Sequence, residues 1–211
     1  MMAFRNTAME YGTIAKSLHW TIAALFLVSY CSVYYRRWFT VAEEDVSLWV
    51  GTPNYTALQL HLASGITIFA FVILRIIWRL YDNTPDLPAG KRWEHISARF
   101  VHYSLYFFMI FMPVTGYLGT GADTAYFNIT QFRETAAYDY LVTQTLQLDW
   151  EVFEKPIDYL HKDIGGAVLV WMLIVLHAGA ALYHHFVRRD DVLRRMLPGG
   201  SGHNDNNKVG R

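Results

Sequence analysis

Four long apolar runs constrain this chain more than any other feature of its sequence. They cover residues 18–36, 60–80, 100–119 and 164–187. About 20 apolar residues in a row suffice for a helix to cross the hydrocarbon core of a bilayer. Such a helix satisfies its own backbone hydrogen bonds, which lipid cannot do for it. The runs therefore predict an all-α membrane protein with four transmembrane helices.

The composition agrees with a membrane protein. Hydrophobic residues make up 53% of the 211 residues and charged residues only 17%, a balance that is unusual for soluble domains. No glycine-rich phosphate loop or nucleic-acid-binding module is visible, so we expect no nucleic-acid partner. The single cysteine, Cys31, excludes an internal disulfide and a cysteine-ligated zinc site. The bulky Tyr30 before it fits no signal-peptide cleavage site, so we expect the first run to remain as a span.

The lysine and arginine residues predict the orientation of the spans. If the N-terminus lies inside, five of the 18 lie on the outer side: Arg36, Arg37, Arg133, Lys155 and Lys162. The other thirteen lie on the inner side: Arg5, Lys16, Arg75, Arg79, Lys91, Arg92, Arg99, Arg188, Arg189, Arg194, Arg195, Lys208 and Arg211. Short loops rich in lysine and arginine stay in the cytoplasm. We therefore expect both termini to be cytoplasmic.

The stretches between and after the spans predict one domain with a long outer loop and a C-terminal tail. Residues 1–197 form one transmembrane domain, and the polar residues 198–211 read as a disordered cytoplasmic tail. Residues 119–160 form a long outer loop that helps to make the outer side net negative. Within this loop, Leu141, Val142, Leu146 and Trp150 recur at a spacing that suits a short helix lying on the bundle.

Four of the nine histidines fall into two pairs at two depths of the predicted membrane. His19 and His177 lie near the inner ends of the first and fourth runs, and His61 and His161 lie at the outer ends of the second and fourth. Ionisable residues within spans are costly and tend to be functional. Two stacked pairs of imidazoles are the arrangement that holds two haems, because haem iron takes neutral imidazole from opposite faces.

Small residues stand one helical turn after these histidines. Gly65 follows His61 by four residues, and Gly165 follows His161 by four, which places each glycine on the face of its histidine. Such residues leave room for a flat macrocycle, but they also let membrane helices pack closely. The sequence leaves both interpretations open.

Four stretches carry a resemblance to a known family. They are SLHW at 17–20, LHLASG at 60–65, VHYSLYFFMIFMPVTG at 101–116 and LHAGAALYHHFVRRDDVLRRMLP at 176–198. These stretches resemble the bacterial cytochrome b561 family, over residues 11–198 apart from the outer loops. The resemblance implies a four-helix bundle in the bacterial inner membrane that encloses two b-type haems. It assigns the inner haem to His19 and His177, and the outer haem to His61 and His161.

The resemblance also implies an activity. A well-described member of the family is a superoxide:ubiquinone oxidoreductase, which takes electrons from superoxide on the periplasmic side and reduces ubiquinone. Arg36 matches an arginine of the family, and Arg36, Arg37 and Lys162 together would form a cationic spot that attracts superoxide. We expect the acidic loop 119–160 to fold away from these three cations.

Two other functions stay open at this stage. The alternative to the superoxide:ubiquinone oxidoreductase is an electron-carrier subunit for a hydrogenase or dehydrogenase partner protein. A membrane interaction protein without haem is a weaker hypothesis, because it leaves the histidines within the spans unexplained.

Two further histidines are candidates for the inner side. His102 opens the third run, where it would contact a haem propionate or a quinone carbonyl, or simply face the lipid headgroups. His184 follows His177 by seven residues and so lies on the same face of the helix. It would serve a propionate or donate a proton to the quinone.

One spacing departs from the family pattern. His161 and His177 are sixteen residues apart, where the family has fourteen. A regular α-helix turns about 100° per residue, so sixteen residues would leave the two rings about 160° apart. Either a π-bulge near Gly165 and Gly166 corrects this phase, or the fourth helix becomes regular only after His161. Pro156, as an early helix start, favours the bulge.

Overall fold

The computed structural model describes residues 4–40, 51–86 and 88–200. Three long α-helices come first: α1 (Thr13–Phe39), α2 (Pro53–Tyr81) and α3 (Arg92–Gly119). The predicted tail lies largely outside these ranges, since residues 201–211 are not among the described ones.

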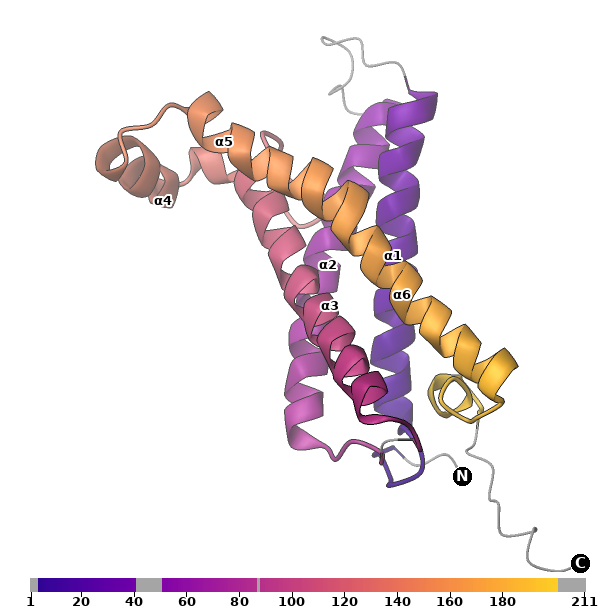
Figure 1. The fold of residues 1–211 in the computed structure, drawn as a ribbon. Coiled ribbons are helices and arrows are strands. Elements are labelled where there is room, and N and C mark those ends of the chain that lie inside the picture. The colour runs from indigo at the N-terminus through magenta and orange to yellow at the C-terminus, as the bar shows by residue number, and fades with distance from the viewer. Residues whose placement is uncertain (1–3, 41–50, 87, 201–211) are drawn as a thin grey trace, which may run out of the picture. The chain divides into compact units, whose positions relative to one another are not determined.

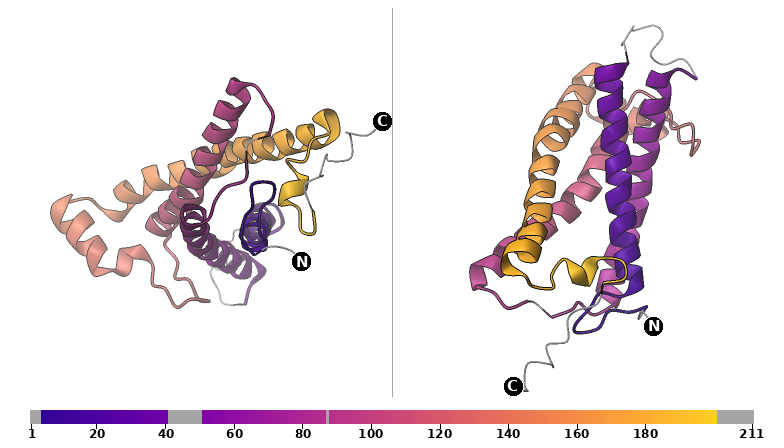
Figure 2. Two further views of the ribbon diagram at one scale, coloured as in Figure 1. Left: turned by 90° about the horizontal axis from the view of Figure 1, so that it is seen from below. Right: turned by 90° about the vertical axis from the view of Figure 1, so that its right-hand side faces the viewer.

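The fourth long helix changes its winding along its length. It begins as α5 (Trp150–Asp158), continues as the π-helix η3 (Tyr159–Leu169) and as α6 (Val170–Tyr183), and ends as the π-helix η4 (His184–Arg188). Figures 1 and 2 show these segments following one another along one helical run. Each turn of a π-helix takes up an extra residue, because its hydrogen bonds run from i to i+5.

Four helices are long and apolar enough to cross a membrane: α1, α2, α3 and the run Trp150–Arg188. No strand occurs in the described ranges, where an isolated bridge joins Thr124 and Ile129. The predicted fold class is therefore confirmed. Each helix extends beyond its apolar run, since polar residues continue a helix past the hydrocarbon. The fourth begins at Trp150, so the outer loop ends ten residues or so before the predicted boundary at 160.

The structure contains two compact units, which we describe separately. The first unit is formed by described residues within Met1–Thr21, Ile73–Leu105 and Met172–Arg211, and the second by those within Ile22–Val72 and Tyr106–Trp171. Each unit therefore draws on parts of all four long helices.

In the second unit, α2 holds the start of the loop that follows α3. Gln59 is 2% exposed. Its Nε2 donates to the Asp123 carbonyl and its Oε1 accepts from the Ala125 N–H, both at 2.8 Å. A buried amide that uses both of its ends is a specific anchor, because leaving either end unpaired would be costly. The loop is therefore fixed to α2 two residues from His61.

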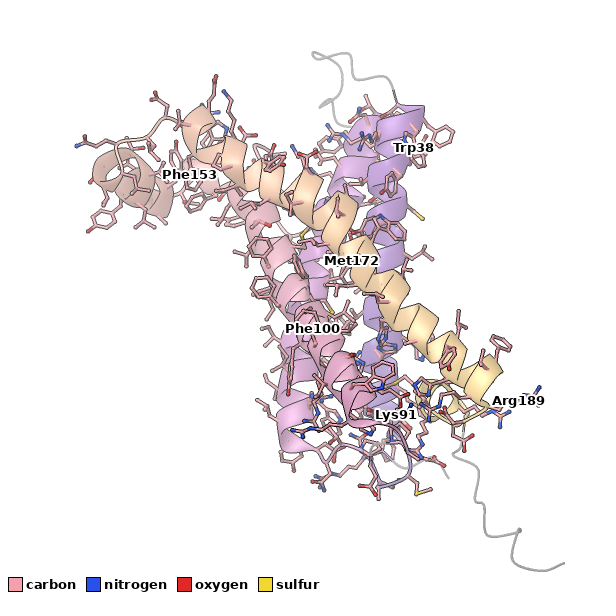
Figure 3. The ribbon with its side chains drawn as sticks, in the orientation of Figure 1. Trp38, Lys91, Phe100, Phe153, Met172 and Arg189 are labelled. Atoms are coloured by element: carbon pink, nitrogen blue, oxygen red, sulfur yellow. The ribbon has the colours of Figure 1, made fainter. Side chains whose placement is uncertain are left out.

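The rest of this loop contains short helical segments. They are a 3₁₀ turn (Phe132–Glu134), α4 (Ala136–Tyr138), and the π-helix η2 (Asp139–Thr145). The short helix expected there is present, and its Val142 is buried. Leu141 and Leu146 are exposed, and Trp150 belongs to α5 instead. The reason is that aromatic rings provide the packing: the ring of Phe153, labelled in Figure 3, makes tilted contacts with Phe132 and Trp150 and an edge contact with Tyr138.

In the first unit, Asp82 ties the N-terminal segment to the end of α2. Its carboxylate is buried and accepts from the Asn6 backbone N–H at 2.8 Å and from Arg5 Nε at 3.1 Å. The Asn6 N–H and the Arg5 guanidinium hold the pKa of this carboxyl below its usual range, since both stabilise the charged form. The N-terminal segment thus depends on an ionised Asp82.

We predict that Asp82→Asn releases the N-terminal segment. Because the folded pKa is lowered, the contact contributes fully above the unfolded value of about 3.9 and is lost as pH falls through the folded pKa. Limited proteolysis should therefore cut within residues 4–12 faster in the variant at pH 7, and the variant should lose the acid dependence seen in the parent. Asp86→Asn, an exposed neighbour, is the control. Equal protection in both variants would contradict the prediction.

Candidate functional site

In the second unit, two histidines from different helices face each other. His61 on α2 and His161 on η3 have ring centroids 6.1 Å apart and planes inclined by 79°. A metal bound about 2 Å from one nitrogen of each ring would separate the centroids by roughly 6 Å. Within the described ranges, no three histidine, cysteine or acidic side chains gather as a metal site. The pair therefore suits a metal that brings its other ligands with it, as haem iron does.

The other ring nitrogen of each histidine is held by a neighbouring helix. His61 Nδ1 lies 3.2 Å from the Ser29 carbonyl and 2.9 Å from Ser29 Oγ. A carbonyl only accepts, so His61 Nδ1 carries the proton. His161 Nδ1 lies 3.2 Å from Thr115 Oγ1, whose own hydroxyl donates to the Phe111 carbonyl.

Both Nδ1 atoms are thus donors, which leaves both Nε2 lone pairs for a metal. Second contacts of this kind fix the tautomer and the ring orientation of metal-binding histidines. The pair His61 and His161 fits haem in both distance and protonation.

In the first unit, three histidines lie together. His177 on α6 has its ring centroid 6.0 Å from that of His19 on α1, and 5.2 Å from that of His102 on α3. The first separation matches two imidazoles on opposite sides of one metal, as in haem, whereas the second is too short for that arrangement. The geometry therefore favours His19 and His177 as the pair and leaves His102 beside them.

Arg75 makes the first unit differ from the second. Its Nη1 lies 2.8 Å from His19 Nδ1. Arginine can only donate, so His19 Nδ1 accepts, and the proton of the neutral ring stands on Nε2. A metal at Nε2 needs the opposite tautomer. The distance between the rings of His19 and His177 therefore suits haem. The tautomer of His19 suits it only once Arg75 has moved away from His19.

The sixteen-residue spacing is accommodated by the π-helix η3. It spans Tyr159–Leu169 and so includes Gly165 and Gly166, as the bulge hypothesis predicted. Eleven residues make about two π turns, and each takes up one residue more than an α turn. Sixteen residues then rotate about as far as fourteen would in an α-helix. Pro156 lies inside α5 and does not start it, because the helix already begins at Trp150.

The small residues divide into two kinds. A Cβ added at Gly65 would meet nothing within 4 Å, so the space beside His61 is open. A Cβ at Gly165 would overlap Met112 Sδ and would lie 2.8 Å from the Leu160 carbonyl. Gly165 thus serves helix packing and the tight π turn, whereas Gly65 borders free space that a flat ring could use.

The three predicted cations of the second unit differ in their surroundings. Arg36 Nε donates to Asn54 Oδ1 at 2.7 Å, and Asn54 Nδ2 donates to Thr40 Oγ1 at 3.1 Å. Arg37 is exposed. Lys162 pairs with the Asp158 carboxylate, so the expectation that residues 119–160 fold away from all three cations is wrong for Lys162. Asp158 stands one helical turn before it on the same face.

His184 has a carboxylate partner in the first unit. Its Nδ1 lies 2.6 Å from Asp190 Oδ2. The chain reaches this position because Arg189 adopts a left-handed conformation with φ of 57° and ends the helix there. Nothing in the sequence connects Asp190 with His184. The same holds for the partners of four other polar residues: Ser29, Thr115, Arg75 and Asn54. In the sequence, these residues could have been noticed only as polar residues that lie within or beside an apolar run.

Comparison with known proteins identifies the family. The model of the prokaryotic cytochrome b561 family matches residues 10–199. The chain belongs to this family. Membership places it among membrane electron-transfer proteins that carry b-type haem, in agreement with its four long apolar helices.

Three relatives illustrate the range within this cytochrome b561 family. Cytochrome b561 homolog 2 of Escherichia coli (strain K12) is 29% identical over 93% of this chain and 95% of its own length. Cytochrome b561 homolog 1 of the same strain is 26% identical over 86% and 93%. The protein named "Probable superoxide oxidase CybB" of Yersinia pestis is 25% identical over 90% and 96%. The similarity extends along nearly the whole of each chain.

We predict that Gly165→Ala destabilises the fourth helix. The added Cβ must displace Met112 and a backbone carbonyl, and overpacking of this kind costs about 1–3 kcal/mol. The thermal unfolding midpoint of the purified protein should fall. Gly179→Ala is the matched control, because a Cβ there would meet nothing within 4 Å. An unchanged midpoint for Gly165→Ala would show that η3 can rewind to absorb the methyl group.

Proposed function

We propose that this cytochrome b561 takes single electrons from superoxide on the outer side of the bacterial inner membrane and delivers them to ubiquinone. Four histidines hold two b-type haems, with His19 and His177 on one and His61 and His161 on the other. The observation that carries the proposal is the pair of imidazoles in each unit, with ring centroids 6.0 and 6.1 Å apart. The similarity to a superoxide oxidase homologue supports the choice of donor.

Haem iron held by two imidazoles supplies reversible one-electron chemistry without a free coordination position. The protein's part is to hold the rings and to tune them. Ser29 and Thr115 fix the rings of His61 and His161 in the metal-binding tautomer. Arg75 donates to His19 here, and its guanidinium would instead pair with an anionic propionate when haem is bound.

Arg36 is the residue that we assign to superoxide. Asn54 is 5% exposed and holds Arg36 by its Nε. The two terminal nitrogens of Arg36 make no hydrogen bond within the described residues, so one edge of the guanidinium remains available for a small anion. Arg37 adds a second positive charge, whereas the Asp158 carboxylate reduces the contribution of Lys162. A held and unneutralised guanidinium is a suitable binding site for a diatomic anion.

The reaction balances with two superoxide ions for each quinone. Each superoxide loses one electron and leaves as dioxygen, and ubiquinone takes two electrons and two protons to become ubiquinol. We assign the quinone to the first unit, near His102 and His184. Asp190 accepts from His184 Nδ1, so Nε2 of His184 is the atom that would take up a proton from water and pass it to the quinone, as a general acid does.

The alternative function is that of an electron-carrier subunit for a hydrogenase or dehydrogenase. The names of the two Escherichia coli relatives specify no donor. In this alternative, the same histidines hold the haems, but Arg36 and Asn54 would have no part in the entry of electrons. The two functions therefore differ in what Arg36 does.

We predict two haems per chain. We also predict that the two histidines of a pair, when replaced one at a time, cause the loss of the same haem. His19→Ala and His177→Ala should each remove one haem, and His61→Ala and His161→Ala should each remove the other. Reduced-minus-oxidised absorption spectra with haem quantitation measure this. His185→Ala, a histidine outside both pairs, should keep two haems. A single haem in the parent, or a low-spin six-coordinate haem that survives in His161→Ala, would refute the assignment.

We predict that superoxide reduces the holoprotein and that Arg36 controls the rate. Replacing Arg36 and Arg37 together by glutamine should slow the reduction roughly tenfold or more and flatten its dependence on salt. Asn54→Leu should slow it too, because Arg36 loses the contact that holds its guanidinium. Stopped-flow mixing with a superoxide source, followed by a ubiquinone analogue, gives the rates.

Arg133→Gln provides the control for this experiment, since it removes one positive charge from the same unit and leaves Arg36 in place. It should leave the rate unchanged. If superoxide leaves the haems oxidised while a quinol or a partner protein reduces them, the carrier function replaces the proposal.

A further inference from the structure

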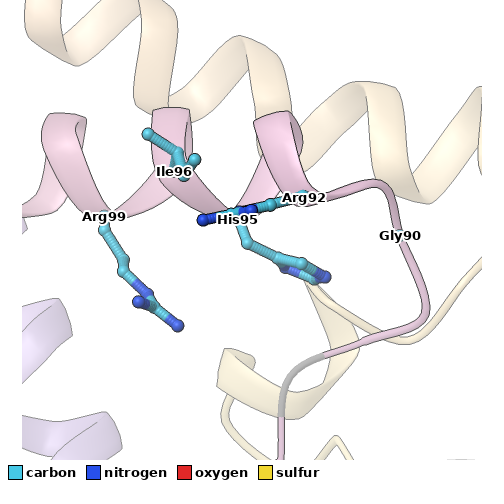
Figure 4. Close-up of a pocket in the computed structure, with 5 residues that line it drawn as sticks. All are labelled: Gly90, Arg92, His95, Ile96 and Arg99. Atoms are coloured by element: carbon cyan, nitrogen blue, oxygen red, sulfur yellow. The ribbon is translucent and has the colours of Figure 1, made fainter.

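A group of basic side chains lies outside the histidine sites, at the start of α3. Arg92, His95 and Arg99 line a pocket of about 420 Å³ together with Gly90 and Ile96. Figure 4 shows that the basic residues come from successive turns of one helix, with Gly90 on the segment that leads into it. All of these residues belong to the first unit.

The two arginines of the pocket carry positive charge that no ion pair neutralises within the described residues. Arg92 and Arg99 form no ion pair or hydrogen bond through their side chains within the described residues. The neighbouring acid, Glu94, is already engaged: its Oε2 accepts from Arg188 Nη1 and from the Lys91 N–H, both at 2.9 Å. No carboxylate is among the residues that line the pocket. The pocket is therefore suited to an anion.

An exposed apolar stripe begins inside the pocket and continues along α3. Ile96 lines the pocket and is 56% exposed; Phe100 and Tyr103 follow at helical spacing and are 69% and 66% exposed. Figure 3 shows Phe100 on α3, further along the helix from Lys91. Residues at i, i+4 and i+7 share one face of a helix. The anion pocket thus opens onto a surface that would accept an extended apolar chain.

We propose that this pocket binds the headgroup phosphate of an anionic phospholipid, with an acyl chain along Ile96, Phe100 and Tyr103. The ligand is a lipid because only an amphiphile satisfies both the arginines and the apolar stripe. The pocket lies at the end of a membrane-spanning helix, where basic clusters recognise anionic headgroups. Trp93, also exposed, is of the type that anchors at this interface. The proposal is independent of the electron donor.

The test uses the purified holoprotein, stripped of lipid in detergent and titrated with phosphatidylglycerol or phosphatidylcholine. Native mass spectrometry measures the retained lipid. The parent should bind phosphatidylglycerol more tightly, and Arg92→Gln with Arg99→Gln should weaken that binding roughly tenfold or more. Arg189→Gln with Arg194→Gln is the matched control. It removes two arginine charges from the same unit, and it should leave the binding as in the parent.

Three further results decide the proposal. Arg92→Lys with Arg99→Lys keeps both charges, so it should retain most of the binding, and loss in this variant would overturn the role of charge. Equal loss in the matched control would mean a diffuse surface effect and would also overturn it. Glycerophosphate tests the acyl chain: displacement of the lipid at comparable concentration would show a site for free phosphate only, whereas failure to displace it supports the lipid.

Discussion

A polar side chain within a membrane-spanning helix must find its partners inside the protein, because lipid offers none. The histidines of this cytochrome obey that constraint through contacts between helices. His61 on α2 is held by Ser29 of α1, and His161 on η3 is held by Thr115 of α3. Each contact orients one ring and at the same time ties two helices together at that depth. The contacts that orient the rings are therefore also contacts between helices.

The same constraint separates the two sites chemically. A carbonyl, or a hydroxyl already engaged as a donor, accepts a hydrogen bond from Nδ1–H and so leaves the Nε2 lone pair for a metal. A guanidinium does the reverse, because it has no lone pair to offer. In the second unit both histidines therefore keep a free Nε2 lone pair, whereas in the first unit Arg75 donates to Nδ1 of His19 and the proton of that ring stands on Nε2. The two sites therefore differ in the atom that contacts each Nδ1, which sets the tautomer of the ring, and not in the distance between the rings.

Irregular winding of the fourth helix is the other device on which the sites depend. His161, Gly165 and Gly166 all lie in the π-helix η3, and His184 lies in the π-helix η4. A wider turn brings a carbonyl close to the Cβ position five residues on, so glycine is favoured there. π-helical turns are frequent at functional sites, because they reset the direction of the side chains that follow. The glycine pair and the long histidine spacing are two consequences of one irregularity.

The sequence by itself determined the number of spans, the grouping of four histidines at two depths, and an irregularity of the fourth helix, for which a π-bulge near Gly165 was one of two explanations. These follow from local rules: apolar runs long enough for the bilayer, the cost of imidazole in lipid, and the phase of a helix over sixteen residues. Only the tertiary structure decided what each polar group contacts. Ser29, Thr115, Arg75 and Asn54 meet their partners across helices, 18 to 56 residues away in the chain. It also gave Lys162 a carboxylate and assigned Gly165 to packing. Periodicity along one helix carries no information about which atoms of another helix lie opposite, because that depends on how side chains fill the space between them.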